Sequence, residues 1–190
     1  MKYLARRLIR YAMRRRNTIV KPYLKGSVLD IGCGGAFLTN FILPGSYVGV
    51  DGNQRLVQQL KEAKPAYEFY CINVDTREGA FKLASLNISF DIITLLAVVE
   101  HLNHPQIVFN ACSLLMRDNG ILAITTPTPL GDSVGRLAAR ISSAGRKAMF
   151  PHVRLYTPQD LDGLLAPLKF KLIHYRKFLF GANQPFIYSK

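Results

Sequence analysis

The sequence predicts an α/β fold in which a doubly wound, mostly parallel sheet has helices on both faces. Beyond residue 26, short apolar runs alternate with helical segments, and this alternation is typical of repeated βαβ units. The run at 90–96 is strongly apolar, as strands are when a parallel sheet is covered on both faces. With 190 residues, the chain has about the length of one ordinary domain.

Turn residues separate the predicted elements and set their order. Pro44-Gly45 and Pro65 end two helices, and Asn119-Gly120 forms the turn into the fifth strand. Helices are expected at 35–43, 54–64, 105–116 and 158–165. Strands are expected at 27–31, 47–50, 67–72, 90–96 and 121–125, and then at 169–180 and 186–188, where an antiparallel hairpin is favoured. The segment 128–152 interrupts this rhythm, and we interpret it as an insertion.

The N-terminal segment 1–25 stands apart from the domain expected at 26–190. It has nine Lys and Arg residues and no acid, in a chain with a formal net charge of +13. Apolar residues recur at helical spacing up to about residue 16, which predicts a basic amphipathic helix. Such a helix fits an anionic membrane surface, RNA phosphates, or packing on its own domain. The RNA hypothesis is weaker, because no aromatic platform accompanies the charges.

Cysteine use and hydropathy favour a cytoplasmic protein, with the possibility of association with the inner face of the membrane. No apolar run reaches the roughly 18 residues that suggest a membrane-spanning helix. The N-terminus lacks the features of a secretory signal. Cys33, Cys71 and Cys112 lie far apart, which disfavours a zinc site or a disulfide framework.

The most informative run is Val-Leu-Asp-Ile-Gly-Cys-Gly-Gly at 28–35. A buried strand enters glycines directly, and glycines let the backbone approach a ligand at the carboxyl end of the sheet. The second strand ends in Asp51, about 20 residues further on, where a carboxylate can accept both hydroxyls of a ribose. Phe37 occupies the position at which a dinucleotide-binding loop needs its third glycine, so a dinucleotide is disfavoured.

These residues resemble motif I and the ribose-binding acid of class I S-adenosylmethionine-dependent methyltransferases. Further ordered segments, which together with motif I span about residues 24–175, resemble the ubiquinone-biosynthesis-like, or methyltransferase type 11, branch of that family. They are the segments at 90–94, 99–102, 116–126 and 154–157. The resemblance implies a Rossmann-like sheet of seven strands with an antiparallel last strand. It also implies methyl transfer from S-adenosylmethionine to a small-molecule or lipid-linked acceptor, by O- or C-methylation.

The resemblance also assigns the cofactor-binding residues. Asn73 and Asp75 are both candidates for the adenine contact, and Asp75 is favoured because a carboxylate accepts more strongly. Asp30 supports either the ligand or the loop. The expected cofactor-binding residues are Asp30, Gly32, Cys33, Gly34, Asp51, Gly52, Asp75 and Leu96.

Methyl transfer is an in-line displacement that needs alignment and exclusion of water, and it needs a base only when the acceptor must lose a proton. The candidates for the catalytic, acceptor-facing side are Glu100, His101 and His152. Some relatives hold a divalent metal with a Glu-His pair and an acid three residues earlier. Here that earlier position is Ala97, so we assign no metal.

The insertion at 128–152 is expected to form a lid over the acceptor. Its basic residues suit an acceptor with phosphate or carboxylate groups. They are Arg136, Arg140, Arg146 and Lys147. Two alternatives remain open: an RNA methyltransferase, and a non-catalytic binding protein on the same fold. The intact glycine loop and Asp51 argue against the second alternative.

Overall fold

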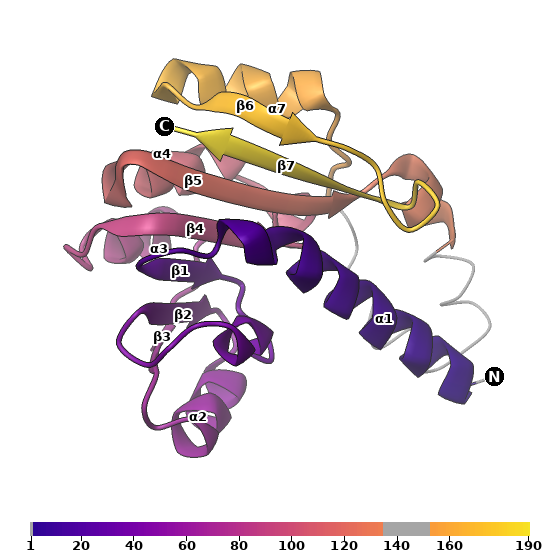
Figure 1. The fold of residues 1–190 in the computed structure, drawn as a ribbon. Helices are drawn as coiled ribbons and strands as arrows, with labels where there is room; N and C mark the ends of the chain where they lie inside the picture. Colours follow the sequence, from indigo (N-terminus) through magenta and orange to yellow (C-terminus); the bar gives the residue numbers. More distant parts are fainter. Residues whose placement is uncertain (1, 135–152) are drawn as a thin grey trace.

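A computed structural model describes residues 2–134 and 153–190, with the backbone alone described at 2–6 and 8–10 (Figure 1). Seven strands form one sheet in the order β3-β2-β1-β4-β5-β7-β6. Their bounds are β1 Val28–Ile31, β2 Tyr47–Asp51, β3 Glu68–Cys71, β4 Phe90–Leu96, β5 Met116–Pro127, β6 Lys171–Tyr175 and β7 Asn183–Ser189. β1 to β5 pair in parallel, and β7 is antiparallel to β5 and β6. The predicted fold class, including its antiparallel last strand, is therefore confirmed.

β1 lies inside the sheet, between β2 and β4, and marks the point where the strand order reverses. Asp30 is opposite Gly49 of β2 on one side and Thr94 of β4 on the other. The connections after β1 and β4 run toward opposite edges of the sheet. Such a switch point leaves a crevice at the carboxyl ends of the strands, where ligands bind in open α/β sheets.

Helices cover both faces of the sheet. One face packs against α3 Arg77–Ala84, α4 Pro105–Leu115 and α7 Pro158–Leu165 through the largest buried apolar cluster. The other face packs against the 3-10 helix η2 Phe37–Asn40 and against α2 Gln54–Ala63. On that same face, α1 Lys2–Val20 and η1 Lys21–Tyr23 cross the sheet near β5 and β7. Two further 3-10 turns are η3 Val99–His101 and η4 Ala166–Leu168.

Side-chain caps explain where several of these helices begin. The Asn53 side chain accepts from the N–H of Leu56 at the start of α2. Thr157 and Asp160 form a capping box at the start of α7. Thr76 caps α3, a helix that was not expected from the sequence.

The expected helix at 35–43 is wrong, because only the four residues of η2 are helical. Gly32, Gly34 and Ala36 have φ values of +68°, +51° and +50°, and these left-handed residues unwind the start of the segment. The strand expected at 169–180 ends at Tyr175, before two residues with positive φ, Leu179 and Phe180.

Three elements are markedly longer than expected, and one of them is β7, which spans Asn183–Ser189 instead of 186–188. β5 begins at Met116 instead of residue 121, with Asn119 in the left-handed region inside it. α1 continues past residue 16, and its last residues, Ile19 and Val20, are buried against the domain. Within the described residues, no helix is long and apolar enough to cross a membrane. Most of the expected insertion, including His152 and its four basic residues, lies outside the described residues.

Candidate functional site

The loop after β1 depends on glycine for both its conformation and its space. Gly32 and Gly34 are in the left-handed region, and the N–H groups of Gly32 and Cys33 both donate to the carbonyl of Val50, at 2.8 and 3.0 Å. A Cβ added to Gly32 would lie 2.4 Å from Cγ2 of Val98. The loop thus presents bare backbone to the crevice at the end of β1.

Asp51 brings a carboxylate to this loop from the end of β2. Its Oδ2 accepts from the N–H of Gly34 at 3.1 Å, and its Oδ1 accepts from the N–H of Asn53 at 2.9 Å. The side chain is half-buried, and Gly52, which follows it, is exposed. A carboxylate oxygen has more than one lone pair, so Asp51 can accept further hydrogen bonds from a ligand in the crevice.

Asp30 lies beneath the loop and is 4% exposed. Its Oδ1 accepts from the hydroxyl of Thr94 at 2.6 Å, and its Oδ2 accepts from the hydroxyl of Tyr47 at 2.9 Å. Burial raises the pKa of Asp30 to about 6; the two hydrogen bonds lower it and the negative charge of Asp51 raises it. Because Asp30 is almost fully buried, unlike the half-buried Asp51, and is held by two side-chain hydroxyls, the contacts favour the loop-supporting role of the two roles expected for Asp30.

A cavity of about 90 Å³ lies between this loop and α1. The structure brings five of the expected cofactor-binding residues to its lining: Asp30, Gly32, Cys33, Gly34 and Leu96. Asp51 joins them through its hydrogen bond to Gly34. Burial raises the pKa of the Cys33 thiol, so this cysteine serves as a neutral wall rather than as a nucleophile.

α1 supplies the opposite wall, which our sequence analysis missed. Met13, Arg16 and Asn17 line the cavity, and they occupy one face of the helix because they are spaced at i, i+3 and i+4. Arg16 Nε donates to Oδ1 of Asn183 at 3.2 Å. Burial lowers the pKa of Arg16, and the negative charge of Glu100 opposes this shift. The spacing was readable in the sequence, but the expected helix ended at residue 16.

Asp75 lies apart from the cavity lining. It accepts from the N–H and the Nδ2 of Asn103, at 3.0 and 2.6 Å, and from the N–H of His104 at 2.9 Å. Partial burial raises the pKa of Asp75, but these hydrogen bonds outweigh burial and the net shift is downward. The carboxylate therefore ties the loop after β3 to the start of α4, and its contact with adenine stays a prediction.

The expected acceptor-facing residues Glu100 and His101 lie in η3, beyond the end of β4. Glu100 is buried, and its carbonyl accepts from the N–H of Val153 at 2.8 Å. Val98, which contacts Gly32, precedes this turn, so η3 adjoins the glycine loop. In the part of the chain that the structure describes, no three His, Cys, Asp or Glu side chains are placed to hold a metal ion. Because His152 lies outside that part, the expected absence of a metal stays a prediction.

Together, the switch point, the glycine loop and the carboxylate after β2 define a Rossmann-like domain that binds a nucleoside cofactor. The cradle fits such a group, because a Cβ at Gly34 would project into open space, with its nearest neighbour 3.9 Å away, so the loop leaves room for a ligand. A protein-family model described as "Methyltransferase domain" matches residues 3–175, and the chain belongs to this family. This match confirms the resemblance found in the sequence.

Individual proteins agree with this assignment. The chain is 28% identical over 162 residues to the mitochondrial ubiquinone biosynthesis O-methyltransferase of Mus musculus, which covers 77% of this chain and 42% of that protein. It is 32% identical over 104 residues to the ubiquinone biosynthesis O-methyltransferase of Glaesserella parasuis, and this match covers 52% of this chain and 44% of that protein. The chain thus spans less than half the length of these curated relatives.

The fold also matches a solved structure. Magnesium protoporphyrin IX methyltransferase from Synechocystis PCC 6803 with bound SAH has a TM-score of 0.68 to this chain at 18% identity, over 96% of this chain and 85% of that one. At this identity the match concerns the fold alone.

Proposed function

We propose that this chain transfers a methyl group from S-adenosylmethionine to a small-molecule or lipid-linked acceptor, by O- or C-methylation. One observation carries the proposal: the carboxylate after β2 is hydrogen-bonded to a left-handed glycine of the loop after β1, at the switch point of the sheet. S-adenosylmethionine, when bound, supplies an electrophilic methyl group on a sulfonium. Family membership and the small-molecule acceptors named for the relatives support the same function.

Each wall of the crevice has a proposed task. Asp51 accepts hydrogen bonds from the ribose hydroxyls, and Gly52 leaves space beside them. Gly32, Cys33 and Gly34 provide backbone for close contact, while Asp30 holds the loop from beneath. Arg16 brings a cation to the cavity lining, so it can neutralise the carboxylate of the methionine portion. Leu96 provides an apolar wall.

On the acceptor side, η3 is the proposed boundary. Glu100 and His101 lie next to the glycine loop, and we assign them, together with His152, to aligning the acceptor or removing its proton. Exclusion of water from this region strengthens every polar contact within it.

The first experiment tests the cofactor site by calorimetry with S-adenosylmethionine. The wild-type chain should bind it, and Asp51→Ala should weaken binding by about 100-fold, since each hydrogen bond from a hydroxyl to a carboxylate contributes roughly 1.5–3 kcal/mol. Asp118→Ala is the matched control, because Asp118 is exposed and lies near the start of β5, at the opposite end of the parallel strands from the crevice. Equal affinity of Asp51→Ala and wild type would refute the proposed cofactor site.

The second experiment identifies the acceptor class. The chain is incubated with methyl-labelled cofactor and a cell extract, which is then separated into aqueous metabolites, organic-soluble lipids and RNA. Label should enter the metabolite or lipid fraction. Label confined to RNA would replace the proposed acceptor with the RNA alternative.

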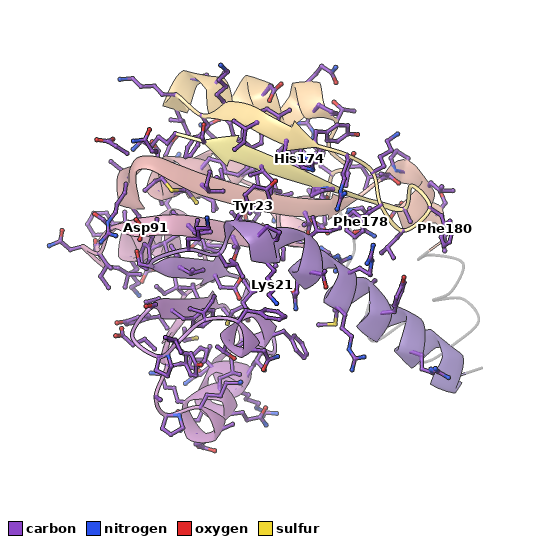
Figure 2. All side chains as sticks on the ribbon, in the orientation of Figure 1. Lys21, Tyr23, Asp91, His174, Phe178 and Phe180 are labelled. Carbon is purple, nitrogen blue, oxygen red and sulfur yellow. The ribbon has the colours of Figure 1, made fainter. Side chains whose placement is uncertain are left out.

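We also propose a cytoplasmic chain that docks on an anionic membrane surface through residues 1–16. Arg7 and Arg15 are exposed on α1. Phe180 is also fully exposed, on the loop before β7 (Figure 2). Thr128 holds this loop, because its hydroxyl donates to the carbonyl of Gly181 at 2.6 Å. An exposed aromatic side chain and a basic helix are both features that suit a lipid interface.

Co-sedimentation with phosphatidylglycerol vesicles tests this docking. Arg7→Gln with Arg15→Gln should weaken vesicle binding by about 30-fold, because each basic residue near an anionic surface contributes about 1 kcal/mol. The control pair is Arg55→Gln with Arg77→Gln, which lies on α2 and α3. Equal loss in both pairs would show that net charge, and not α1, determines binding.

A further inference from the structure

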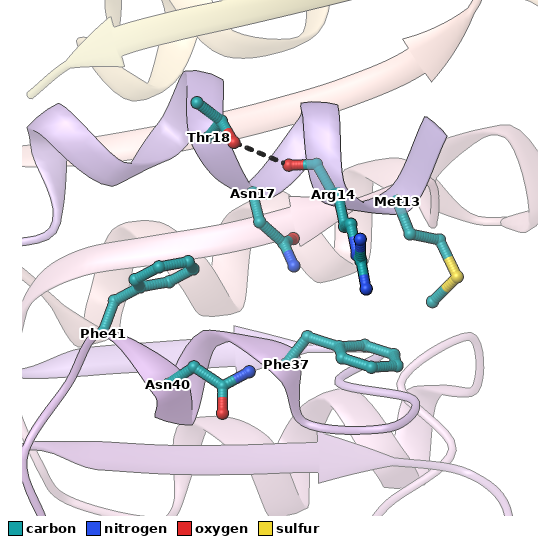
Figure 3. A pocket seen from close by; sticks show the side chains of 7 residues that line it. All are labelled: Met13, Arg14, Asn17, Thr18, Phe37, Asn40 and Phe41. Atoms are coloured by element: carbon teal, nitrogen blue, oxygen red, sulfur yellow. Dashed lines mark hydrogen bonds between the residues drawn. The ribbon is translucent and has the colours of Figure 1, made fainter. Parts of the chain in front are cut away.

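A second, larger hollow adjoins the cofactor cavity. It is a groove of about 620 Å³ between the second half of α1 and η2 (Figure 3). Binding sites for small molecules are about 300–1,000 Å³ in volume, so the groove has the size of a ligand site. The side chains that enclose it include Met13, Arg14, Asn17, Phe37, Asn40 and Phe41.

The lining of this groove is aromatic, amide and cationic. Phe37 and Phe41 are 46% and 42% exposed, although both are large apolar side chains. The amides of Asn17 and Asn40 make no hydrogen bond to another described residue (Figure 3). Among the residues that the structure describes, no acidic side chain lines the groove. Sites for small molecules are typically lined by aromatic side chains together with a few polar groups, and the two phenylalanines and two amides of this groove match that description.

Positive charge is concentrated at the same place. The side chain of Arg14 lines the groove, and Nζ of Lys21 lies 5.0 Å from the centroid of the Phe41 ring. A guanidinium and an ammonium beside aromatic faces attract an anionic group and disfavour a cation. The charge of the groove therefore complements a ligand that has both an apolar body and a negative group.

The groove and the cofactor cavity are neighbours that share a wall. Met13, Asn17 and Phe37 line both spaces. Arg14, Asn40 and Phe41 line the groove and are absent from the cavity lining. A molecule in the groove thus lies next to the space beside the glycine loop, and the residues that line the groove alone allow the two spaces to be tested separately.

We propose that this groove holds the methyl acceptor, and that the acceptor has a flat apolar body and an anionic group. This inference rests on the proposed function and makes it more specific. It places recognition of the acceptor on α1 and η2, on a different wall of the crevice from η3 and the expected lid. The phenylalanines stack on the apolar body, and Arg14 and Lys21 pair with the anion.

The probes are naphthalene-2-carboxylate and its neutral analogue naphthalene-2-methanol, each titrated by calorimetry against the chain saturated with S-adenosylhomocysteine. The carboxylate should bind about fivefold more tightly than the alcohol, because it alone can pair with the groove cations. Phe41→Ala and Arg14→Gln should each weaken binding of the carboxylate about fivefold. Phe81→Ala and Arg77→Gln are the matched controls, because both residues lie on α3 and should leave binding unchanged.

The affinity for S-adenosylhomocysteine, measured on the same variants, separates the outcomes. It should stay within about twofold of wild type in Phe41→Ala and Arg14→Gln, which also shows that both variants are folded. A parallel loss of this affinity would assign the groove to the cofactor, and equal binding of naphthalene-2-carboxylate by all variants would remove the groove as a site. Both results overturn the inference and leave the proposed function intact. A wild-type chain that binds no S-adenosylhomocysteine would instead overturn the proposed function, and with it the acceptor role of the groove.

Discussion

β2 ends in Asp51, and the loop after β3 contains Asp75 at the same edge of the sheet. The two carboxylates have different hydrogen-bond partners. Asp51 accepts a hydrogen bond from the N–H of Gly34 in the glycine loop. Asp75 accepts three hydrogen bonds from Asn103 and His104, and it thereby joins the loop after β3 to the segment before α4. Both carboxylates accept a hydrogen bond at the start of a helix, Asp51 from Asn53 and Asp75 from His104, but of the two Asp51 is the one that also accepts from the glycine loop lining the cavity.

This comparison shows that acids at the carboxyl ends of neighbouring parallel strands can have different hydrogen-bond partners. What separates Asp51 is the loop that faces it, in which Gly32 and Gly34 keep the backbone bare and left-handed. Asp30 completes that region from beneath, since Tyr47 and Thr94 hold it in place. The β1–β2 region is thus organised around a cavity, whereas the β3 region is organised around a loop contact.

The largest effect is expected at Gly32, on which the cavity side of the comparison depends. Gly32→Ala should lower the free energy of unfolding by about 2–4 kcal/mol, because a left-handed alanine is strained and its Cβ overlaps Val98. Affinity for S-adenosylmethionine should fall about tenfold or more as the loop shifts. Urea unfolding and calorimetry measure the two quantities.

Gly163→Ala is the control for that substitution. Gly163 lies within α7, and a Cβ added there would meet no neighbouring side chain or packed element within 4 Å, so alanine should stabilise the chain by roughly 0.5–1 kcal/mol. The double variant Gly32→Ala with Val98→Ala should recover part of the lost affinity. If Gly32→Ala binds the cofactor as tightly as wild type, the bare backbone is not what distinguishes the β1–β2 region.

The next effect concerns pH and the carboxylate beneath the loop. Burial raises the pKa of Asp30 to about 6, so the folded chain holds a proton on Asp30 at pH values where the unfolded chain has lost it. Folding is therefore favoured by Asp30 at low pH, and this contribution falls as pH rises from about 4 to about 6. Relative to Asp30→Asn, the wild type should lose about 2–3 kcal/mol of unfolding free energy between pH 4 and pH 7.

Urea unfolding of both chains at intervals of half a pH unit measures this difference. Subtracting the Asn variant removes the titration of the other carboxyl groups. A difference that stays flat over this range would show that Asp30 keeps an ordinary pKa despite its burial, and that Tyr47 and Thr94 stabilise its charge fully.

The strands and the glycine loop could be predicted from the sequence better than the contacts around them, for physical reasons. Strong apolar runs such as 90–96 and the glycines at 32–35 act locally, so the strands and the cradle could be located. Arg16 meets Asn183 across 167 positions of sequence, and no local pattern reports such a contact. The hydrogen bonds of Asp75 could not be predicted either, because its partners, Asn103 and His104, approach only once the chain is folded. The helix expected at 35–43 was wrong because helix propensity does not reveal that three alternate residues, at 32, 34 and 36, have left-handed backbone conformations.

The smallest effect is expected at Asp75, and its sign with pH is opposite to that of Asp30. Hydrogen bonds from Asn103 and His104 lower the pKa of Asp75 overall, so its stabilising contribution is present at neutral pH and is lost as the pH falls. Asp75→Asn should lower the free energy of unfolding by about 1 kcal/mol at pH 7, and the difference from wild type should vanish on acidification. Its affinity for S-adenosylmethionine should stay within about twofold of wild type, because the side chain is absent from the cavity lining. A tenfold loss of that affinity with unchanged stability would place Asp75 at the adenine after all, and the two aspartates would then serve the same site.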